Sequence, residues 1–323
     1  MSARFNAVAA SLLTGVLLLV IQVVPARPLL LAERFWQGAG WLQVVFFTIY
    51  AGWLAFKFSE ANNALRLRPR IWLLFSLVFF AQLVMGLAGF EKMLMTGKLH
   101  LPIPALIIAG PLYRGGDFFM LILFTATVLV AGPAWCSHLC YIGAWDDLCS
   151  RSRNTIGELP VWWRRARIAM LMVVVVVTLL LRALNVATAT ALLFAGIFGL
   201  TGVAVMLGLS RKLGTMVHCT SFCPIGLLAN WLGKISPWRM RIAAGCSGCM
   251  QCQKVCRYEA LSRENILARR VGNSCTLCGD CVALCHSGQI GYRLPLLSAE
   301  KARAAFVTVI TSLHAVFLAV ARI

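Results

Sequence analysis

The chain has 323 residues, of which 60% are hydrophobic and 13% are charged, and its mean hydropathy is +0.82. Because a soluble domain is about half apolar and about a quarter charged, this composition excludes an ordinary soluble protein and is typical of a membrane protein. The formal net charge of +19 does not indicate a nucleic-acid partner, since the basic residues cluster beside apolar runs, where they set topology and face anionic lipid.

Long apolar runs divide the chain into candidate transmembrane helices. Each run is close to the roughly 20 residues that a helix needs to cross the hydrocarbon core. The runs are 7–24, 41–58, 71–90, 117–134, 168–186, 189–209 and 304–321. We expect the first to be an uncleaved anchor, because it is longer than the apolar part of a usual signal peptide. The last, which contains His314, either spans the membrane or lies along its surface, so the sequence predicts six or seven transmembrane helices.

Basic residues in the loops predict the orientation. Arg4 and the loops after the second, fourth and sixth runs hold fifteen basic residues, among them Arg164, Arg165 and Arg167, whereas the opposite loops hold six. Because loops rich in Lys and Arg stay in the cytoplasm, this contrast places the N-terminus and all the cysteine motifs on the cytoplasmic side.

One outer loop is rich in apolar residues. Residues 99–112 carry three prolines, which should prevent a regular helix through the loop. Irregular backbone at membrane depth is tolerated only where protein or water covers it. Two interpretations remain open: a re-entrant segment that forms one wall of a quinone pocket, with His100 and Arg114 as candidate residues, or a packed loop at the membrane interface.

Two cysteine pairs form an internal repeat. Cys136-Ser-His-Leu-Cys140-Tyr-Ile-Gly follows the fourth apolar run, and Cys219-Thr-Ser-Phe-Cys223-Pro-Ile-Gly follows the sixth. Matching motifs on the same side of matching spans indicate a duplicated unit around a pseudo-twofold axis. Cysteines four apart in a helical turn face the same way, so two pairs brought together offer four ligands to a further metal or redox site. Structural or transiently redox-active thiols are the alternative, and we expect Cys149, which has no partner pattern, to be a buried thiol.

Eight cysteines near the C-terminus form two quartets with the spacing of bacterial ferredoxins. In each quartet three cysteines are separated by two residues each, and a fourth follows after three more: Cys246, Cys249, Cys252 and Cys256, then Cys275, Cys278, Cys281 and Cys285. The fourth cysteine of such a run reaches the other cluster, so we expect a crossed arrangement. One [4Fe–4S] cluster would be held by Cys246, Cys249, Cys252 and Cys285, and the other by Cys256, Cys275, Cys278 and Cys281. A zinc ribbon or disulfides would leave the third cysteine of each run unexplained.

These features predict a fold in three parts. Residues 1–235 form an all-α polytopic membrane domain that contains both CxxxC motifs. Residues 236–295 form a small α+β segment like a bacterial ferredoxin with two [4Fe–4S] clusters, and residues 296–323 form a C-terminal transmembrane or interfacial helix. The quartets indicate metal ligation in a reducing compartment rather than the disulfides of a secreted protein.

The order of these motifs resembles the NapH/MauN/NosR group of membrane polyferredoxins, the 4Fe-4S quinol dehydrogenase membrane components. The resemblance covers roughly residues 71–293, with Tyr141 in place of the proline of the first CxxxC motif and with more spans than NapH has. It implies a multi-pass protein of the bacterial cytoplasmic membrane that oxidises quinol and relays electrons through two [4Fe–4S] clusters. The implied partners are the quinone pool and a redox protein, either a periplasmic reductase or dehydrogenase or a ferredoxin subunit.

Two other functions remain open. The related CcoG group implies a copper reductase that serves oxidase assembly, in which the cysteine pairs would bind copper. The third possibility is a non-enzymatic membrane iron–sulfur sensor, which would pass the redox state of its clusters to a partner protein.

Overall fold

The computed structural model describes residues 2–26, 28–94 and 101–320. It divides the chain into two compact units, the first formed by Met1–His100 with Tyr292–Ile323 and the second by Leu101–Gly291. The boundaries expected at 235 and 295 followed cysteine motifs and hydropathy, whereas this division follows spatial contacts. Those contacts put the ferredoxin segment in one unit with the spans that carry the CxxxC motifs, and they join the last helix to the first spans.

Seven helices in the described part of the chain are long and apolar enough to cross a membrane. They are Ala3–Val23, Ala39–Phe58, Ala61–Leu87, Phe119–Leu139, Arg165–Ala183, Thr188–Leu213 and Ala299–Ala319. Each overlaps one of the apolar runs in the sequence. The prediction of a mainly helical fold is therefore confirmed, and these seven helices suggest a multi-pass membrane protein.

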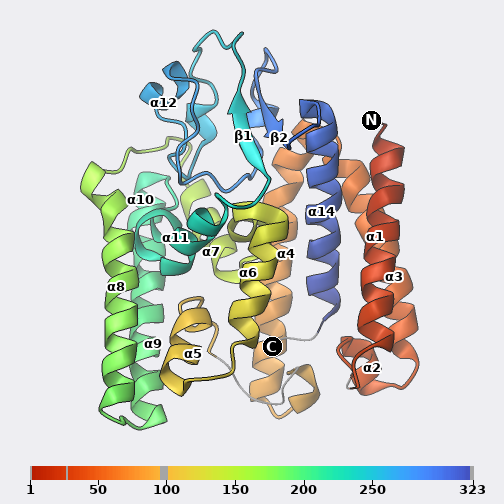
Figure 1. Cartoon of the computed structure of the whole chain (residues 1–323), viewed down its shortest axis with the longest axis vertical. Coiled ribbons are helices and arrows are strands. Elements are labelled where there is room, and N and C mark those ends of the chain that lie inside the picture. Colours follow the sequence, from red (N-terminus) through yellow and green to blue (C-terminus); the bar gives the residue numbers. More distant parts are fainter. Residues whose placement is uncertain (1, 27, 95–100, 321–323) are drawn as a thin grey trace. The chain divides into compact units, whose positions relative to one another are not determined.

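The first unit is a bundle of long helices (Figure 1). Its elements are α1 (Ala3–Val23), α2 (Leu31–Phe35), α3 (Ala39–Phe58), α4 (Ala61–Leu87), the short turn η1 (Glu91–Met93) and α14 (Ala299–Ala319). The helices α1, α3 and α14 pack along one another, and fully buried residues such as Leu18 and Leu54 form the core between them.

The last helix, α14, runs antiparallel to α3. Near the start of α14, Arg303 donates a hydrogen bond to the carbonyl oxygen of Phe58 at the end of α3, over 2.8 Å. Near the end of α14, the carbonyl oxygen of Ala319 accepts a hydrogen bond from the Gln43 side chain at the start of α3, over 2.7 Å. Since α14 follows a candidate span along its whole length, the structure favours a seventh span over a helix on the membrane surface.

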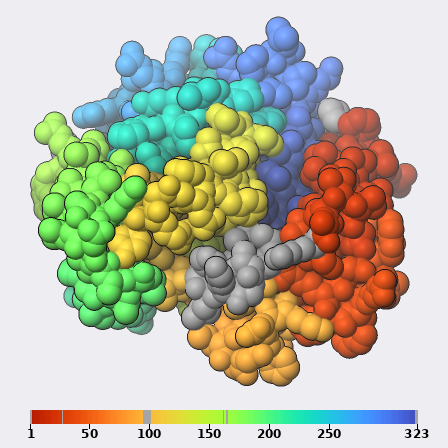
Figure 2. Space-filling model, turned by 60° about the horizontal axis from the view of Figure 1, so that its bottom comes forward, coloured from red at the N-terminus to blue at the C-terminus, as the bar shows by residue number. Residues whose placement is uncertain are grey.

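The second unit contains the two repeats with CxxxC motifs. Its helices are α5 (Leu106–Arg114), α6 (Phe119–Ala131), α7 (Tyr141–Arg151), α8 (Val161–Ala183), α9 (Thr188–Val205), α10 (Arg211–Leu213) and α11 (Pro224–Leu232). Short helical turns join them: η2 (Gly132–Ala134), η3 (Trp135–Leu139), η4 (Met206–Ser210) and η5 (His218–Phe222). Apolar side chains such as Leu180 and Leu200 are exposed on α8 and α9, as expected for helices that face lipid. Figure 2 shows this helical pair, in green, at the surface.

The helix α5 corrects the expectation for the apolar outer loop. The prolines in residues 99–112 were expected to prevent a regular helix, but α5 begins at Leu106 and contains Pro111 in its interior. Neighbouring helices make a proline tolerable here, because they cover backbone that it leaves unpaired. Just before α5, the segment packs closely against α9, since a Cβ atom on Gly199 would lie 2.9 Å from Cδ1 of Ile103.

The ferredoxin segment contains two short strands and three short helical elements. β1 (Arg239–Ile242) pairs with β2 (Ile290–Arg293), at which the chain passes from the second unit into the first. Between them lie η6 (Gln253–Val255), α12 (Arg263–Leu267) and α13 (Asp280–Ala283). The burial of β1 alternates, which is the pattern of a strand with one side on a core. The segment thus shows part of the predicted small α+β fold.

Candidate metal centres

Two cavities of the ferredoxin segment collect the eight quartet cysteines in the crossed arrangement. The outer cavity has an empty volume of about 360 Å³, including the part open to solvent, and is lined by Cys246, Cys249, Cys252 and Cys285. The inner cavity has an empty volume of about 340 Å³ by the same measure and is lined by Cys256, Cys275, Cys278 and Cys281. We call them outer and inner because Cys249 of the first is exposed, whereas Cys281 of the second is buried. The structure therefore brings together the two ligand sets that the spacing predicts.

The two cysteine loops share a backbone pattern that explains their sequences. In the first loop, Gly248 and Met250 flank the central cysteine with φ of 69° and 59°. In the second, Leu277 and Gly279 flank it with φ of 56° and 83°. Left-handed residues among right-handed ones turn backbone N–H groups toward one side, which creates a concavity for an anion. Two of the four are not glycine, and such strained residues persist where the surrounding structure holds them for function.

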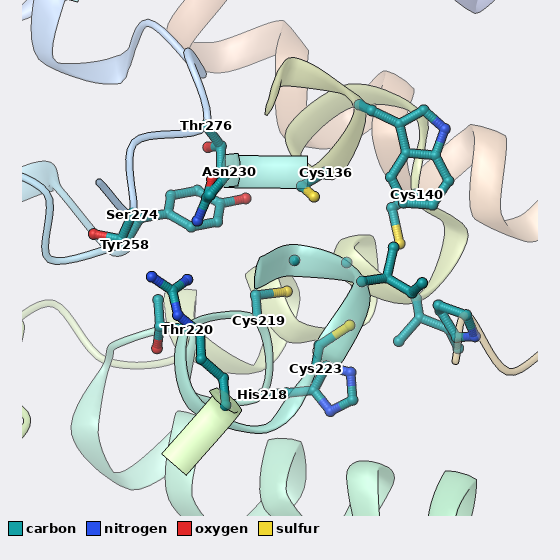
Figure 3. A pocket seen from close by; sticks show the side chains of 17 residues that line it. Cys136, Cys140, His218, Cys219, Thr220, Cys223, Asn230, Tyr258, Ser274 and Thr276 are labelled. Atoms are coloured by element: carbon teal, nitrogen blue, oxygen red, sulfur yellow. The ribbon is translucent and has the colours of Figure 1, made fainter. Parts of the chain in front are cut away.

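A third cavity brings the two CxxxC pairs together. Its empty volume, including the part open to solvent, is about 440 Å³, and Cys136, Cys140, Cys219 and Cys223 all line it. Figure 3 shows their four sulfur atoms pointing into the same space. Cys136, Cys140 and Cys223 are buried and Cys219 is half-buried. The sequence left the relation between the pairs open, and the structure joins them into one four-cysteine site.

The two repeats reach this cavity through the same local structure. In each, the first cysteine lies in a π-helical turn, η3 or η5, and the second is the N-cap of the next helix, α7 or α11. The N-cap cysteines have nearly identical backbone angles, φ −77° and ψ 114° for Cys140 and φ −74° and ψ 117° for Cys223. The chain therefore does not present each pair from one regular α-helix, as expected, but from a π turn, which is frequent at functional sites.

Helix N-termini favour the thiolate form of the second cysteine in each pair. Burial raises the pKa of Cys140 to about 12 and that of Cys223 to about 11. The backbone N–H groups two and three residues further on oppose this rise and lower both pKa values. Since ligating cysteines must lose their protons, a cation in this cavity would displace protons from all four thiols.

The glycine of the second CxxxC motif, Gly226, is required because two stretches of backbone approach each other closely at this position. A Cβ atom on Gly226 would lie 2.9 Å from the carbonyl oxygen of Cys219. The backbone of α11 therefore passes directly beside the π turn that carries Cys219. This contact explains why the motif continues to a glycine three residues after its second cysteine. In contrast, Tyr141 and Pro224 both occupy the first helical position, where a proline is favoured but not required.

A buried cation belongs to the four-cysteine cavity. Arg167 of α8 lines it with only 9% of its surface exposed, and its Nε atom has no hydrogen-bond partner among the described residues. A buried charge is costly unless it is paired. From the sequence, we interpreted Arg167 and Arg165 alike, as basic residues that set topology, because the residues around them do not distinguish the two. In the structure Arg165 is exposed, whereas Arg167 is buried. The cavity thus carries a positive charge that suits an anionic occupant.

Buried carboxylates connect α7 to the second CxxxC motif and to the inner ferredoxin loop. Asp146 of α7 accepts a hydrogen bond from the backbone N–H of Cys219 over 3.0 Å, which ties one repeat to the other. Burial raises the pKa of Asp146 to about 6. Arg151 of the same helix bonds both Asp147, over 2.6 Å, and Asp280, over 2.9 Å. Because Asp280 precedes Cys281, this network fixes the inner ferredoxin loop to α7.

Two other residues singled out in the sequence, Arg114 and Cys149, do not line the cysteine cavities. His100 is outside the described residues. Arg114 ends α5 and forms an ion pair with Asp117 over 2.9 Å, with nearly half of its side chain exposed. Cys149 is half-buried on α7, so it is less buried than expected. Pro104, from the apolar outer loop, does line the four-cysteine cavity.

The shape of the three sites fits a cluster better than a single ion. Among the residues that the structure describes, no group of three or more His, Cys, Asp or Glu side chains converges as it would on one metal ion. The thiols instead surround a space, as a [4Fe–4S] cluster requires, because four irons and four sulfides separate its four Cys ligands.

Comparison with protein families finds two matches to the family described as 4Fe-4S binding domain, at residues 117–168 and 192–243. The matched segments are the two repeats with Cys136 and Cys140 and with Cys219 and Cys223. They do not include the quartets. Neither a comparison with curated proteins nor one with solved structures gives a match.

Fold and comparison together define the class of this protein. It is an iron–sulfur, ferredoxin-like protein with a 4Fe-4S binding domain in two repeats, and it has helices suited to several membrane crossings. Iron–sulfur clusters transfer single electrons, so a 4Fe-4S binding domain suggests iron–sulfur electron transfer.

Proposed function

We propose that this protein oxidises quinol in a bacterial cytoplasmic membrane and delivers electrons to a redox partner through three [4Fe–4S] clusters. The outer and inner cavities would hold two clusters, and the four cysteines of the CxxxC pairs would hold the third. When bound, the clusters supply one-electron transfer at potentials set by their surroundings. The excess of basic residues on one side supports a cytoplasmic ferredoxin segment and N-terminus.

The observation that carries this proposal is the continuity between the four-cysteine cavity and the inner cavity. Tyr258 and Thr276 line both cavities. The hydroxyl of Ser137, beside Cys136, donates a hydrogen bond over 2.8 Å to the carbonyl oxygen of Thr276, beside Cys275. One hydrogen bond thus connects residues adjacent to two candidate ligands. This arrangement supports electron exchange between the membrane part of the unit and the ferredoxin segment.

The surroundings of the four-cysteine cavity support a donor that is dissolved in lipid. Pro104 lines the cavity, and α5, which follows it, packs against α6 and α8. A quinol that diffuses in the bilayer would meet this segment before it meets the cysteines. Its headgroup would approach along α5, at whose outer end Arg114 lies, while the buried Arg167 favours electron acceptance inside the cavity.

Quinol oxidation can be tested on the purified protein in lipid nanodiscs. Addition of a short-chain quinol under argon should bleach the visible absorption of the clusters and produce the EPR signals of reduced [4Fe–4S] centres. The double variant C136A/C219A should keep dithionite-reducible ferredoxin clusters but lose their reduction by quinol. Failure of the intact protein to exchange electrons with any ubiquinol or menaquinol analogue would refute the proposal.

A second candidate, copper reduction during oxidase assembly, is favoured by one observation. Four thiols in one enclosed site are soft ligands, which select Cu(I) as well as iron–sulfur clusters. Metal analysis of the anaerobically purified protein separates the two. Copper at one ion per chain, lost in C136A/C219A while iron stays constant, would favour the copper function.

A further inference from the structure

The helix α12 contributes to the wall of the outer cavity. Ile266 of α12 lines this cavity and is buried. Leu267, the next residue, lies beside the first cysteine loop, since a Cβ atom on Gly248 would lie 3.5 Å from its Cδ2 atom. Within its unit, α12 lies at the end away from α5 (Figure 1). The helix α12 therefore lies directly beside the outer cavity and its first cysteine loop.

One large apolar side chain is exposed on this part of the surface. Leu267 is 62% exposed, and Cys249 of the outer cavity is exposed. Solvent can therefore reach the loop around one candidate ligand of the outer cluster. A redox protein that docks on Leu267 would lie beside the first cysteine loop, which carries three of the candidate ligands of this cluster.

Exposed arginines lie on both sides of Leu267 in the sequence. Arg263 begins α12, and Arg269 and Arg270 follow it, while Glu264 is the exposed acid of the helix. These arginines lie midway between α11 and α14 in the sequence, so they are not the flanks of an apolar helix that set topology. Arginine around an apolar anchor is typical of protein interfaces.

The backbone at Arg269 gives an independent observation. Arg269 has φ of 52°, and the turn closes α12 with hydrogen bonds from Arg269 N–H to the Ile266 carbonyl and from Arg270 N–H to the Asn265 carbonyl, over 3.0 and 2.8 Å. This is the glycine position of a helix C-cap. An arginine there costs backbone strain, and such strain points to a functional reason for the side chain.

We propose that α12 and its C-terminal turn form the docking surface for an acidic, soluble one-electron carrier protein. This inference rests on the proposed electron-transfer function and identifies the kind of partner. Leu267 would supply the apolar contact, and Arg263, Arg269 and Arg270 would attract the carboxylates of the partner. One electron passes between the outer cluster and the carrier, with no bond made or broken.

The test measures binding in neutral phosphatidylcholine nanodiscs, with oxidised plastocyanin as an acidic carrier and cytochrome c as a basic one. The patch variant R263Q/R269Q/R270Q is compared with R211Q/K212Q/K234Q, which removes three other exposed basic residues of the same unit. Iron and sulfide content confirm that both variants are loaded. Association rates are recorded from low to high salt, and electron transfer from dithionite-reduced protein is recorded in parallel.

We expect the patch variant to associate with plastocyanin about tenfold more slowly than the control variant at low salt, because charge steering changes association rates by this order or more. The difference should vanish at high salt. L267A should weaken binding at every salt concentration. R269G should raise the unfolding temperature, since it relieves strain, and still slow association.

Equal rates for the patch and control variants, or binding of cytochrome c in preference to plastocyanin, would overturn the docking surface. So would association that needs phosphatidylserine in the nanodisc and not the carrier, which would assign the arginines to lipid. Because dithionite reduces the protein in this assay, a failure of quinol oxidation leaves these results interpretable. Normal quinol oxidation with equal rates would refute the docking surface alone.

Discussion

The two ferredoxin cavities and the four-cysteine cavity each bring four cysteines together, but the chain does this differently in the two kinds of site. Each ferredoxin loop supplies three ligands within seven residues, and left-handed residues shape the loop around them. The four-cysteine cavity takes two ligands from each of two repeats that lie more than eighty residues apart, as 136 and 219 show. The first kind of site depends on local backbone conformation, and the second depends on how helices pack.

This difference predicts different responses to mutation. A ferredoxin loop is a small segment in which the cluster takes the place of a hydrophobic core, so loss of a ligand should unfold its surroundings. The four-cysteine cavity is lined mainly from η3, α7, α8, η5 and α11, and these elements are held by helix packing as well. Loss of a ligand there should remove the cluster and leave the helices folded.

The largest effect is expected for C278A, which removes a ligand of the inner cavity. Because the quartets are crossed, the loop that loses its cluster also carries Cys285 of the outer cavity. We expect a loss of about four to eight iron atoms per chain and a cooperative loss of structure in the ferredoxin segment. Iron and sulfide analysis with limited proteolysis measures both. Unchanged iron content would contradict the ligand assignment.

A smaller effect is expected for C136A/C219A, which removes one ligand of each pair. About four iron atoms per chain should be lost, with the thermal unfolding of the ferredoxin segment unchanged. C149A is the control, because Cys149 does not line the cavity, and it should keep its full iron content. If iron and copper content and turnover in C136A/C219A all equal those of the control, the pairs are structural thiols.

The contrast also explains what the sequence could predict. The ligand sets of the quartets follow from spacing, because the few residues between the cysteines leave little freedom. The spans follow from hydropathy, and the internal repeat from the matching motifs. The sequence could not predict that the two CxxxC pairs meet in one cavity, because this depends on how the helices from α6 to α11 pack. Nor could it predict the place of Arg167 in the cavity, which depends on burial that the nearby Arg165 does not share. The helical part of the outer loop, which contains Pro111, was missed because its neighbours tolerate the proline.

The next effect concerns the close contact between α11 and the π turn. G226A places a methyl group 2.9 Å from the carbonyl oxygen of Cys219 and should destabilise the second repeat by about 1–3 kcal/mol. G196A is the matched control, since nothing lies within 4 Å of a Cβ atom there and alanine is the better helix former. Thermal unfolding followed at the cluster absorption should show a lower midpoint for G226A alone. Equal midpoints would mean that the backbone relaxes without cost.

The smallest effect tests how the environment of the four-cysteine cavity sets its potential. An added electron makes a cluster more negative, so the buried positive charge of Arg167 should stabilise the reduced form. R167Q should therefore lower the reduction potential of this cluster by on the order of 60 mV, which corresponds to a tenfold change in a one-electron equilibrium. R165Q, on the same helix but exposed, should change it little, because solvent screens its charge. EPR redox titration measures both variants, and the two ferredoxin clusters serve as internal references. A potential that is the same in R167Q and R165Q would show that Arg167 does not act on the cavity through its charge.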